Sequence, residues 1–276
     1  MIDFAKITST TSRYNFHSHT QFCDGRADME AMVQGAIASG LEHYGFSPHS
    51  PAPVASPCNM SRESVPEYLQ DVERLRKVYG DKLNLYASME IDYFGDDWGP
   101  AHEFFRSMPL DYRIGSVHFI PSIVNEGKIV DIDGPYEGFD RKMQEEFDGD
   151  IEEVVRRFYR QEQRMIESGC FDIVGHFDKI GNNANHYCPG IEDTPWYERL
   201  VRETFEMILD KGYLIEVNTK AYGDIGRLYP NQRYFGWLKE YKLPLLVNSD
   251  AHFTHLTDAG RREAFELLKK AGVIAK

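Results

Sequence analysis

His17 and His19 are separated by one residue near the start of the chain, in the segment Asn15-Phe16-His17-Ser18-His19. In an extended chain, residues i and i+2 point to the same side about 7 Å apart, so both imidazoles face one point. Such a pair is by itself a weak indication of a metal site, because it also occurs by chance. Its weight depends on which other residues lie beside it.

Residues able to bind a metal ion also stand at or near the ends of most other segments predicted to be strands. These residues are His49, Glu90, His118, His176, Asp250 and His252. In parallel α/β architectures the carboxyl ends of all strands open at one face, so residues far apart in the sequence converge there. The sequence therefore predicts a metal centre at that face.

Glu90 and Asp24 are the acidic candidates for which a role other than metal binding is an alternative. Glu90 stands in the apolar run Leu85-Tyr86-Ala87-Ser88-Met89-Glu90-Ile91, where burying a carboxylate is costly unless a cation or hydrogen-bond donors neutralise it. A metal ion meets that need, and a salt bridge to an arginine is the alternative. Asp24 is either a ligand or part of a turn with Gly25. His43, His102, His186 and His255 lack a strand-end position and are interpreted as surface residues, with His255 the first exception to consider.

Nitrogen and oxygen ligands without a thiolate favour Zn, Mn or Fe. Nine candidates are too many for one ion, but with a bridging carboxylate they fit two to three divalent metal ions. The nine are His17, His19, Asp24, His49, Glu90, His118, His176, Asp250 and His252. Three divalent ions carry about +6 against about −3 for the carboxylates, and such a pocket attracts phosphate.

Short apolar runs alternate with helical patterns along the chain, which predicts a parallel sheet with helical crossovers. Seven strands are expected, at Tyr14–His17, His43–Ser47, Leu83–Ile91, Tyr112–Val117, Phe171–Val174, Leu214–Val217 and Leu245–Val247. Helices are expected from Met29 to Gly40 and at Ser61–Tyr79, Ile151–Ser168, Pro195–Lys211, Asn231–Tyr241 and Leu256–Ala271. The segment Pro121–Asp150 is the least regular and is predicted to be a long loop.

Length and charge narrow the class of protein. A chain of 276 residues fits one α/β barrel, and we expect a single domain over residues 1–276. The net charge of −13 disfavours nucleic acid as a partner. The absence of a long apolar run and of a leader-like N-terminus predicts a cytoplasmic protein with no membrane partner, and the four cysteines are expected to be reduced. The oligomeric state stays open.

The ordered set of nine residues, spanning nearly the whole chain, resembles the PHP (polymerase and histidinol phosphatase) family. The contexts Gly45-Phe46-Ser47-Pro48-His49, Gly115-Ser116-Val117-His118-Phe119 and Gly175-His176-Phe177-Asp178 are most similar to its histidinol-phosphatase branch. The second motif departs from the commoner Thr-Asp-His form, since Ser47-Pro48-His49 stands there, but the ligand itself is kept.

The resemblance implies a distorted (β/α)7 barrel, a TIM-barrel-like α/β fold, with three metal ions at the carboxyl ends of the strands. It assigns the ligands in three sets: His17, His19, Glu90 and Asp250; Glu90, His118 and His176; and Asp24, His49 and His252. Glu90 would bridge two ions. Glu90, Asp250 and His252 would serve catalysis, in which a metal-bridging hydroxide attacks phosphorus in line with the leaving alkoxide.

The resemblance further implies a phosphomonoesterase whose substrate is a small-molecule phosphate ester, L-histidinol phosphate, hydrolysed in histidine biosynthesis. An arginine usually assists, and Arg160 is the first candidate for binding phosphate, with Arg227 the second. An acidic wall would match the substrate amine, with Asp131, Asp133, Asp96 and Asp97 as candidates. The general acid stays unassigned.

Three alternatives stay open. The first is a phosphoesterase acting on another small ester or on a nucleic-acid end, of which the acidic charge disfavours the polymer. The second is an amidohydrolase-type barrel, which would require a bridging lysine where this chain has His118. The third is a non-catalytic binding domain on the same scaffold, whose mark would be lost ligands.

Overall fold

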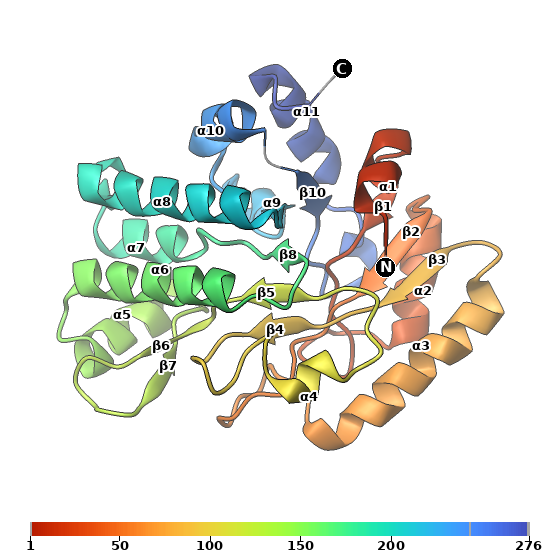
Figure 1. Ribbon diagram of the computed structural model, residues 1–276, viewed down its shortest axis with the longest axis horizontal. Helices are drawn as coiled ribbons and strands as arrows, with labels where there is room; N and C mark the ends of the chain where they lie inside the picture. The colour runs from red at the N-terminus through yellow and green to blue at the C-terminus, as the bar shows by residue number, and fades with distance from the viewer. Residues whose placement is uncertain (1, 243, 275–276) are drawn as a thin grey trace.

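Parallel strands form the centre of the computed structural model, which describes residues 2–242 and 244–274 (Figure 1). The strands are β1 Tyr14–Asn15, β2 His43–Phe46, β3 Asn84–Ala87, β4 Glu90–Asp92, β5 Ile114–Ser116, β6 Phe119–Pro121, β7 Ile129–Asp131, β8 Ile173–Val174, β9 Leu214–Asn218 and β10 Leu245–Asn248. Two parallel sheets result, ordered β1-β2-β3 and β10-β9-β8-β5-β4. The antiparallel pair β6-β7 lies outside them.

The two sheets close into one barrel. Isolated parallel bridges join Ser18 to Ala251 and His49 to Glu90. β3 and β4 share one position in the barrel, because β3 pairs with β2 and β4 pairs with β5. The expected strand Leu83–Ile91 is therefore interrupted, at a point where the Tyr68 hydroxyl donates to the Ser88 carbonyl at 2.6 Å. The described residues thus form a distorted (β/α)7 barrel, which confirms the expected fold.

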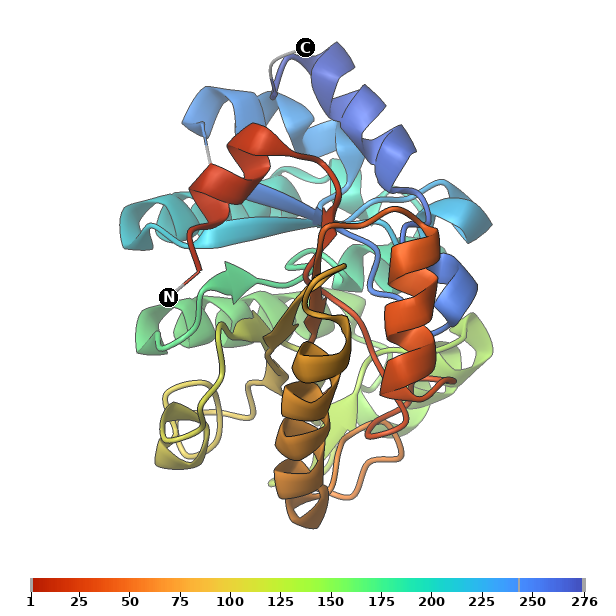
Figure 2. The same cartoon turned by 90° about the vertical axis from the view of Figure 1, so that its right-hand side faces the viewer.

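Helices surround the barrel. The α-helices are α1 Phe4–Thr10, α2 Met29–Ala38, α3 Val65–Tyr79, α4 Glu103–Arg106, α5 Tyr136–Glu146, α6 Ile151–Ser168, α7 Ile180–Tyr187, α8 Pro195–Lys211, α9 Tyr222–Ile225, α10 Phe235–Tyr241 and α11 Arg261–Ala271. Short 3-10 helices are η1 Arg62–Ser64, η2 Ile191–Asp193, η3 Gln232–Tyr234 and η4 Thr254–Leu256. The long helices α6 and α8 pack together on one side (Figure 1), and α2 and α3 run side by side on another (Figure 2). No helix among the described residues is long and apolar enough to cross a membrane.

Local sequence explains why α6 begins and ends as predicted. Asp150 caps its first turn by accepting a hydrogen bond from the Glu153 backbone N–H at 2.9 Å. Gly169 ends the helix with φ of 73°, in the left-handed region that glycine adopts without strain. Between these ends, apolar residues such as Phe158 and Met165 are fully buried in the largest core cluster. The helix therefore packs against the barrel through a mainly apolar face, in which Glu162 is also buried.

The segment Pro121–Asp150 is not the long loop that its sequence predicts, and that prediction is wrong. It contains β7, which pairs with β6, and the helix α5. Phe139 and Met143 of α5 are fully buried in the main core, so tertiary packing stabilises this helix. The helices α1, α4, α7 and α9 were also not predicted, because elements of four to eight residues are too short to show a clear periodicity.

Phe4 of α1 packs into a separate apolar cluster with strand residues that include Phe16, Tyr112 and Leu246. Its ring lies 5.0 Å from that of Phe16 and 5.6 Å from that of Tyr112, centroid to centroid. Phe4→Ala is expected to lower the free energy of unfolding by about 3 kcal/mol, because it leaves a cavity against buried aromatic rings. Urea denaturation measures this, with Lys6→Ala on the exposed face of α1 as the control. Equal effects of the two variants would contradict the packing role.

Candidate metal centre

All nine predicted ligands lie at the same end of the barrel. His17 and His19 follow β1, Asp24 stands in the loop after them, and His49 follows β2. Glu90 opens β4, His118 follows β5, His176 follows β8, and Asp250 and His252 follow β10. All but Asp24, whose side chain is 23% exposed, are buried or nearly so. The parallel topology therefore brings together side chains that are up to 235 residues apart, from His17 to His252.

The first group of side chains surrounds one side of Glu90. His17 Nε2 lies 3.2 Å and His19 Nε2 lies 3.6 Å from Glu90 Oε2. Asp250 Oδ1 lies 3.0 Å from His19 Nε2 and 3.8 Å from His17 Nε2. Two imidazoles and two carboxylates thus converge through one atom each.

The second group uses the other oxygen of Glu90. Glu90 Oε1 lies 2.7 Å from His176 Nε2 and 3.5 Å from His118 Nε2. The two imidazole nitrogens are 3.2 Å apart. Because the two groups use different oxygens of one carboxylate, Glu90 has the geometry of a bridging ligand.

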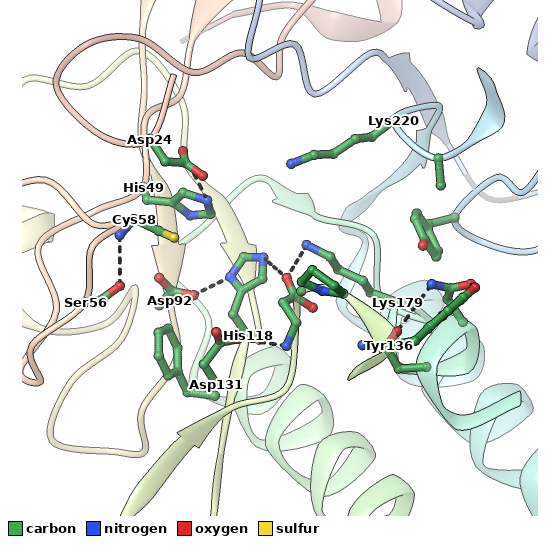
Figure 3. A pocket seen from close by; sticks show the side chains of 18 of the residues that line it. Asp24, His49, Ser56, Cys58, Asp92, His118, Asp131, Tyr136, Lys179 and Lys220 are labelled. Carbon is green, nitrogen blue, oxygen red and sulfur yellow. Dashed lines mark hydrogen bonds and ion pairs between the residues drawn. The ribbon is translucent and has the colours of Figure 1, made fainter. Parts of the chain in front are cut away.

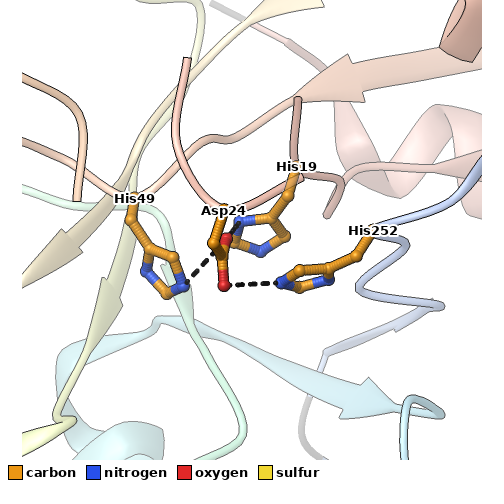
Figure 4. A group of neighbouring side chains, drawn as sticks. All are labelled: His19, Asp24, His49 and His252. Carbon is orange, nitrogen blue, oxygen red and sulfur yellow. Dashed lines mark ion pairs between the residues drawn. The ribbon is translucent and has the colours of Figure 1, made fainter. Parts of the chain in front are cut away.

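The third group lies toward solvent around Asp24 (Figure 4). His252 Nε2 lies 3.3 Å from Asp24 Oδ2, and His49 Nε2 lies 3.9 Å from Asp24 Oδ1. His19 Nδ1 approaches the same carboxylate at 3.5 Å. The structure therefore adds His19 to the neighbours of Asp24, which the sequence did not predict.

These residues fit divalent metal ions. Ligand atoms about 2.1 Å from a tetrahedral zinc ion lie about 3.4 Å from one another, which matches the separations above. Several candidate ligand atoms are also buried and have no hydrogen-bond partner within residues 2–242 and 244–274: His17 Nε2, His19 Nε2, Asp24 Oδ1, His49 Nδ1 and Glu90 Oε2. Buried polar atoms are normally satisfied, so unpartnered atoms around common points indicate that the site is built for cations.

Electrostatics supports the same conclusion. Burial lowers the pKa of His19 and of His49 to about 3, which keeps both imidazoles neutral and able to donate a lone pair. Burial would raise the pKa of Asp250, but the Lys220 ammonium and the His17 imidazole hold it well below its ordinary value. Burial would lower the pKa of His17, whereas Glu216, Asp250 and Glu90 together raise it well above its ordinary value. The buried carboxylates around His17 therefore favour the binding of positive charge between them.

Two further carboxylates, those of Glu216 and Asp92, accept hydrogen bonds from candidate ligand residues, and the sequence did not predict either of them. Glu216 of β9 accepts a hydrogen bond from His17 Nδ1 at 2.7 Å and from the His176 backbone N–H at 3.1 Å. Asp92 of β4 accepts one from His118 Nδ1. Such outer carboxylates fix the orientation and tautomer of a ligating histidine. Glu216 was detectable by the same signal as Glu90, since it is a carboxylate inside an apolar strand.

A cavity of about 790 Å³ opens beside the candidate ligands (Figure 3). Asp24, His49 and His118 form part of its wall, and Lys179 and Lys220 extend into it from the other side. Asp131, Asp133 and Tyr136 contribute from the segment after β6. Its size suits a small molecule rather than a polymer.

Neither predicted phosphate-binding arginine lines this cavity. Arg160 lies on the exposed face of α6, where it pairs with Glu153 at 2.8 Å. Arg227 is nine-tenths buried and pairs with Glu192 at 2.9 Å and with Asp178 at 3.3 Å. Both guanidinium groups are therefore engaged in ion pairs and neither belongs to the cavity lining, so their binding of phosphate stays a prediction.

Glu162 of α6 is fully buried near Asp178, and neither carboxylate oxygen has a hydrogen-bond partner among the described residues. Burial and Asp178 raise the pKa of Glu162 well above its ordinary value, so the folded protein keeps a proton that the unfolded chain releases above about pH 4.3. The stability from this proton is complete below the unfolded pKa and declines as the pH rises toward the folded pKa.

Glu162→Gln cannot ionise, so it should gain stability relative to the wild type between pH 5 and pH 8. The expected gain in the free energy of unfolding is about 1 kcal/mol or more over that range. Urea unfolding of both proteins at the two pH values measures it. A difference between them that does not change with pH would contradict the raised pKa.

Comparison with known proteins identifies the class. A family model described as the PHP domain matches residues 15–220. The chain belongs to the PHP family, which confirms the resemblance seen in the sequence. The ligand-bearing segments from His17 to His176 lie within the matched region, and Asp250 and His252 lie beyond it.

The particular relatives are phosphatases. The chain is 25% identical over 276 residues to the histidinol-phosphatase of Lactococcus lactis, covering 94% of this chain and 90% of that protein. It is 24% identical over 274 residues to a probable histidinol-phosphatase of Schizosaccharomyces pombe, covering 93% and 86%. A crystal structure of the Lactococcus lactis histidinol phosphate phosphatase with zinc, L-histidinol and phosphate superposes with a TM-score of 0.72 at 21% identity, covering 95% of this chain and 94% of that one.

A second solved structure has the same fold. The putative histidinol phosphatase of Listeria monocytogenes superposes with a TM-score of 0.77 at 22% identity, covering 91% of this chain and 99% of that one. The barrel and its closure are therefore the fold of this family.

Proposed function

We propose that this protein is a metal-dependent phosphomonoesterase that hydrolyses L-histidinol phosphate to L-histidinol and inorganic phosphate. The observation that carries the proposal is Glu90, whose two oxygens face two groups of histidines beside a cavity of small-molecule size. The relatives described above are histidinol-phosphatases by name, and that similarity supports the choice of substrate. Hydrolysis of the ester would serve histidine biosynthesis.

The proposed cofactors are two to three divalent ions, with Zn, Mn or Fe as candidates. His17, His19, Glu90 and Asp250 would hold the first, Glu90, His118 and His176 the second, and Asp24, His49 and His252 the third. The zinc in the Lactococcus lactis enzyme supports zinc as one occupant. Bound ions of this kind supply Lewis acidity toward phosphoryl oxygens and lower the pKa of a bound water.

The residues of this chain would then orient the reaction. Glu90 fixes the spacing between the first two groups because it offers one oxygen to each. Asp250 and His252, which follow one strand, link the first group to the third. The buried wall behind them excludes bulk water, so the charges act in a medium of low dielectric constant, where they are strongest.

Asp131 is the proposed contact for the amine of the substrate. Of the four aspartates considered from the sequence, Asp131 and Asp133 line the cavity. Both are ion-paired, Asp133 with the mostly buried Lys179 and Asp131 with Lys142 at 3.3 Å, but the Asp131 side chain is 45% exposed against 25% for Asp133 and is therefore the more accessible from the cavity. Asp96 pairs with Arg164 elsewhere, and Asp97 does not line the cavity.

Asp131→Asn is expected to lower kcat/KM for L-histidinol phosphate about 10-fold, since it removes a charge-assisted contact. It should leave kcat/KM for p-nitrophenyl phosphate, which carries no amine, nearly unchanged. Steady-state kinetics on both esters tests this. Equal losses on the two substrates would contradict amine recognition.

The test of the proposed function is a panel of phosphate esters offered to zinc-loaded protein. It includes L-histidinol phosphate, p-nitrophenyl phosphate, a phosphotyrosine peptide and a 3′-phosphorylated oligonucleotide. We expect L-histidinol phosphate to give the highest kcat/KM by at least about 100-fold. A higher value for any other ester would overturn the substrate, and would favour another small ester or a nucleic-acid end.

We also propose that residues 1–276 act as a single PHP phosphoesterase domain in the cytoplasm. The relatives align along nearly all of this chain, which supports one domain. Cys23, Cys58, Cys170 and Cys188 are all free, as is usual in a reducing compartment.

A further inference from the structure

A phosphate group in the cavity would need a cation beside it, and neither Arg160 nor Arg227 lines the cavity. Among the described residues that line the cavity, Lys179 and Lys220 are the lysines, and there is no arginine. The two lysines differ in their ion pairs and in their exposure to solvent. Lys179 is mostly buried, with its side chain 17% exposed, and forms an ion pair with Asp133. Lys220 is 42% exposed, so its ammonium is accessible from the cavity.

β9 aims Lys220 at the candidate metal centre. This is a barrel strand for which the sequence predicted no ligand, yet its polar residues at every second position serve the site. Glu216 accepts from His17, and Asn218 Nδ2 donates to Asp250 Oδ2 at 3.1 Å. Lys220 follows two residues later, and its backbone N–H donates to Asn218 Oδ1 at 3.0 Å. The side chain of Asn218 thus positions both the Asp250 carboxylate and the backbone of Lys220.

The Lys220 ammonium lies against two candidate ligand atoms. Its Nζ is 3.1 Å from His252 Nε2 and 3.5 Å from Asp250 Oδ1. Once His252 Nε2 or Asp250 Oδ1 binds a divalent ion, its lone pair is no longer free to accept a hydrogen bond from the Lys220 ammonium. The positive charge of the ion also repels that ammonium. With ions bound, the half-exposed Lys220 would therefore turn its charge into the cavity, where an anion gains most from it.

We infer that Lys220 binds the phosphoryl group in the cavity, as a point-charge donor to its non-bridging oxygens. The inference rests on the proposed function for its substrate class. Lysine is suited to this role because its three N–H donors rotate freely on a flexible stem. Lys179 contributes charge to the same wall, but its pairing with Asp133 leaves Lys220 as the residue that contacts phosphate.

The test is calorimetric titration of inorganic phosphate into zinc-loaded protein, with the zinc counted on the same sample. The variants are Lys220→Met and Lys220→Arg, and Lys211→Met on the exposed end of α8 is the matched control. We expect Lys220→Met to keep the wild-type zinc count and to raise the Kd for phosphate about 10- to 100-fold. Lys220→Arg should recover part of the loss, and Lys211→Met should bind as the wild type does.

Three results would overturn the inference: no phosphate binding by the wild type, unchanged binding by Lys220→Met, or loss of zinc together with phosphate in that variant. The last would make Lys220 a support of the metal centre instead. Failure of the proposed function looks different. If phosphate binding depends on Lys220 but L-histidinol phosphate is not the preferred ester, the substrate is wrong and the role of Lys220 stands.

Discussion

Glu90→Gln is expected to lower the number of bound metal ions and to reduce kcat by about 1,000-fold or more. Loss of an outer partner of a metal ligand already costs about 10- to 100-fold, and Glu90 faces two groups of ligands directly. The amide keeps the size of the side chain but loses the charge, and its nitrogen cannot bind a metal cation. The measurement is metal content by mass spectrometry together with phosphate release by the same sample.

The matched control for this variant is Glu126→Gln, at an exposed position between β6 and β7. It removes the same charge and should change neither metal content nor kcat. If Glu90→Gln kept the full complement of ions and the wild-type kcat, Glu90 would not be a ligand. Its burial without a cation would then need another explanation.

Glu216→Gln is expected to weaken zinc binding about 10- to 100-fold while the fold is kept. Glu216 accepts from His17 Nδ1 and from the His176 backbone, and the Nδ2 groups of Asn218 and Asn248 donate to it at 3.0 Å. Glutamine still accepts from His17 but no longer raises the basicity of the imidazole, so metal affinity falls before structure does. Competition with a zinc chelator measures the affinity.

Glu145→Gln on the exposed face of α5 is the control for this prediction. A second readout separates positioning from catalysis, because kcat of the Glu216→Gln protein should return toward the wild-type value at saturating zinc. A zinc affinity equal to that of the wild type would show that Glu216 only fills space in the barrel.

Apart from Asp24, which stands in a loop, the candidate ligands were predictable because their positions depend on local information. An apolar run predicts a strand, and the residue at its end faces the same edge as the residues at the ends of its parallel neighbours. His17, His118 and Asp250 follow this rule, and Glu90 follows it relative to β3, although it is the first residue of β4. The division of Leu83–Ile91 into β3 and β4 did not disturb the prediction, because β4 still presents Glu90 to the centre.

The proposed phosphate contact, Lys220, was not predictable in the same way. Arg160 lies on a helix, and the helical pattern shows which residues face solvent but not whether that surface reaches the cavity. Arg227 is held by Glu192, and no sequence pattern marks a pair formed across 35 residues. Lys220 gave no strand-end signal because its strand was expected to end at Val217 without a ligand. The helix α5 was hidden because its stability comes from burial of Phe139 and Met143 in the main core.

The measurement that tests the central claim most directly is the return of activity to metal-free protein. The protein is stripped with a chelator, zinc or manganese is added back in counted steps, and phosphate release from L-histidinol phosphate is followed at each step. We expect no turnover without metal and full turnover at two to three ions per chain. Turnover by the metal-free protein, or saturation of the site with no turnover of any phosphate ester, would contradict a metal-dependent phosphoesterase.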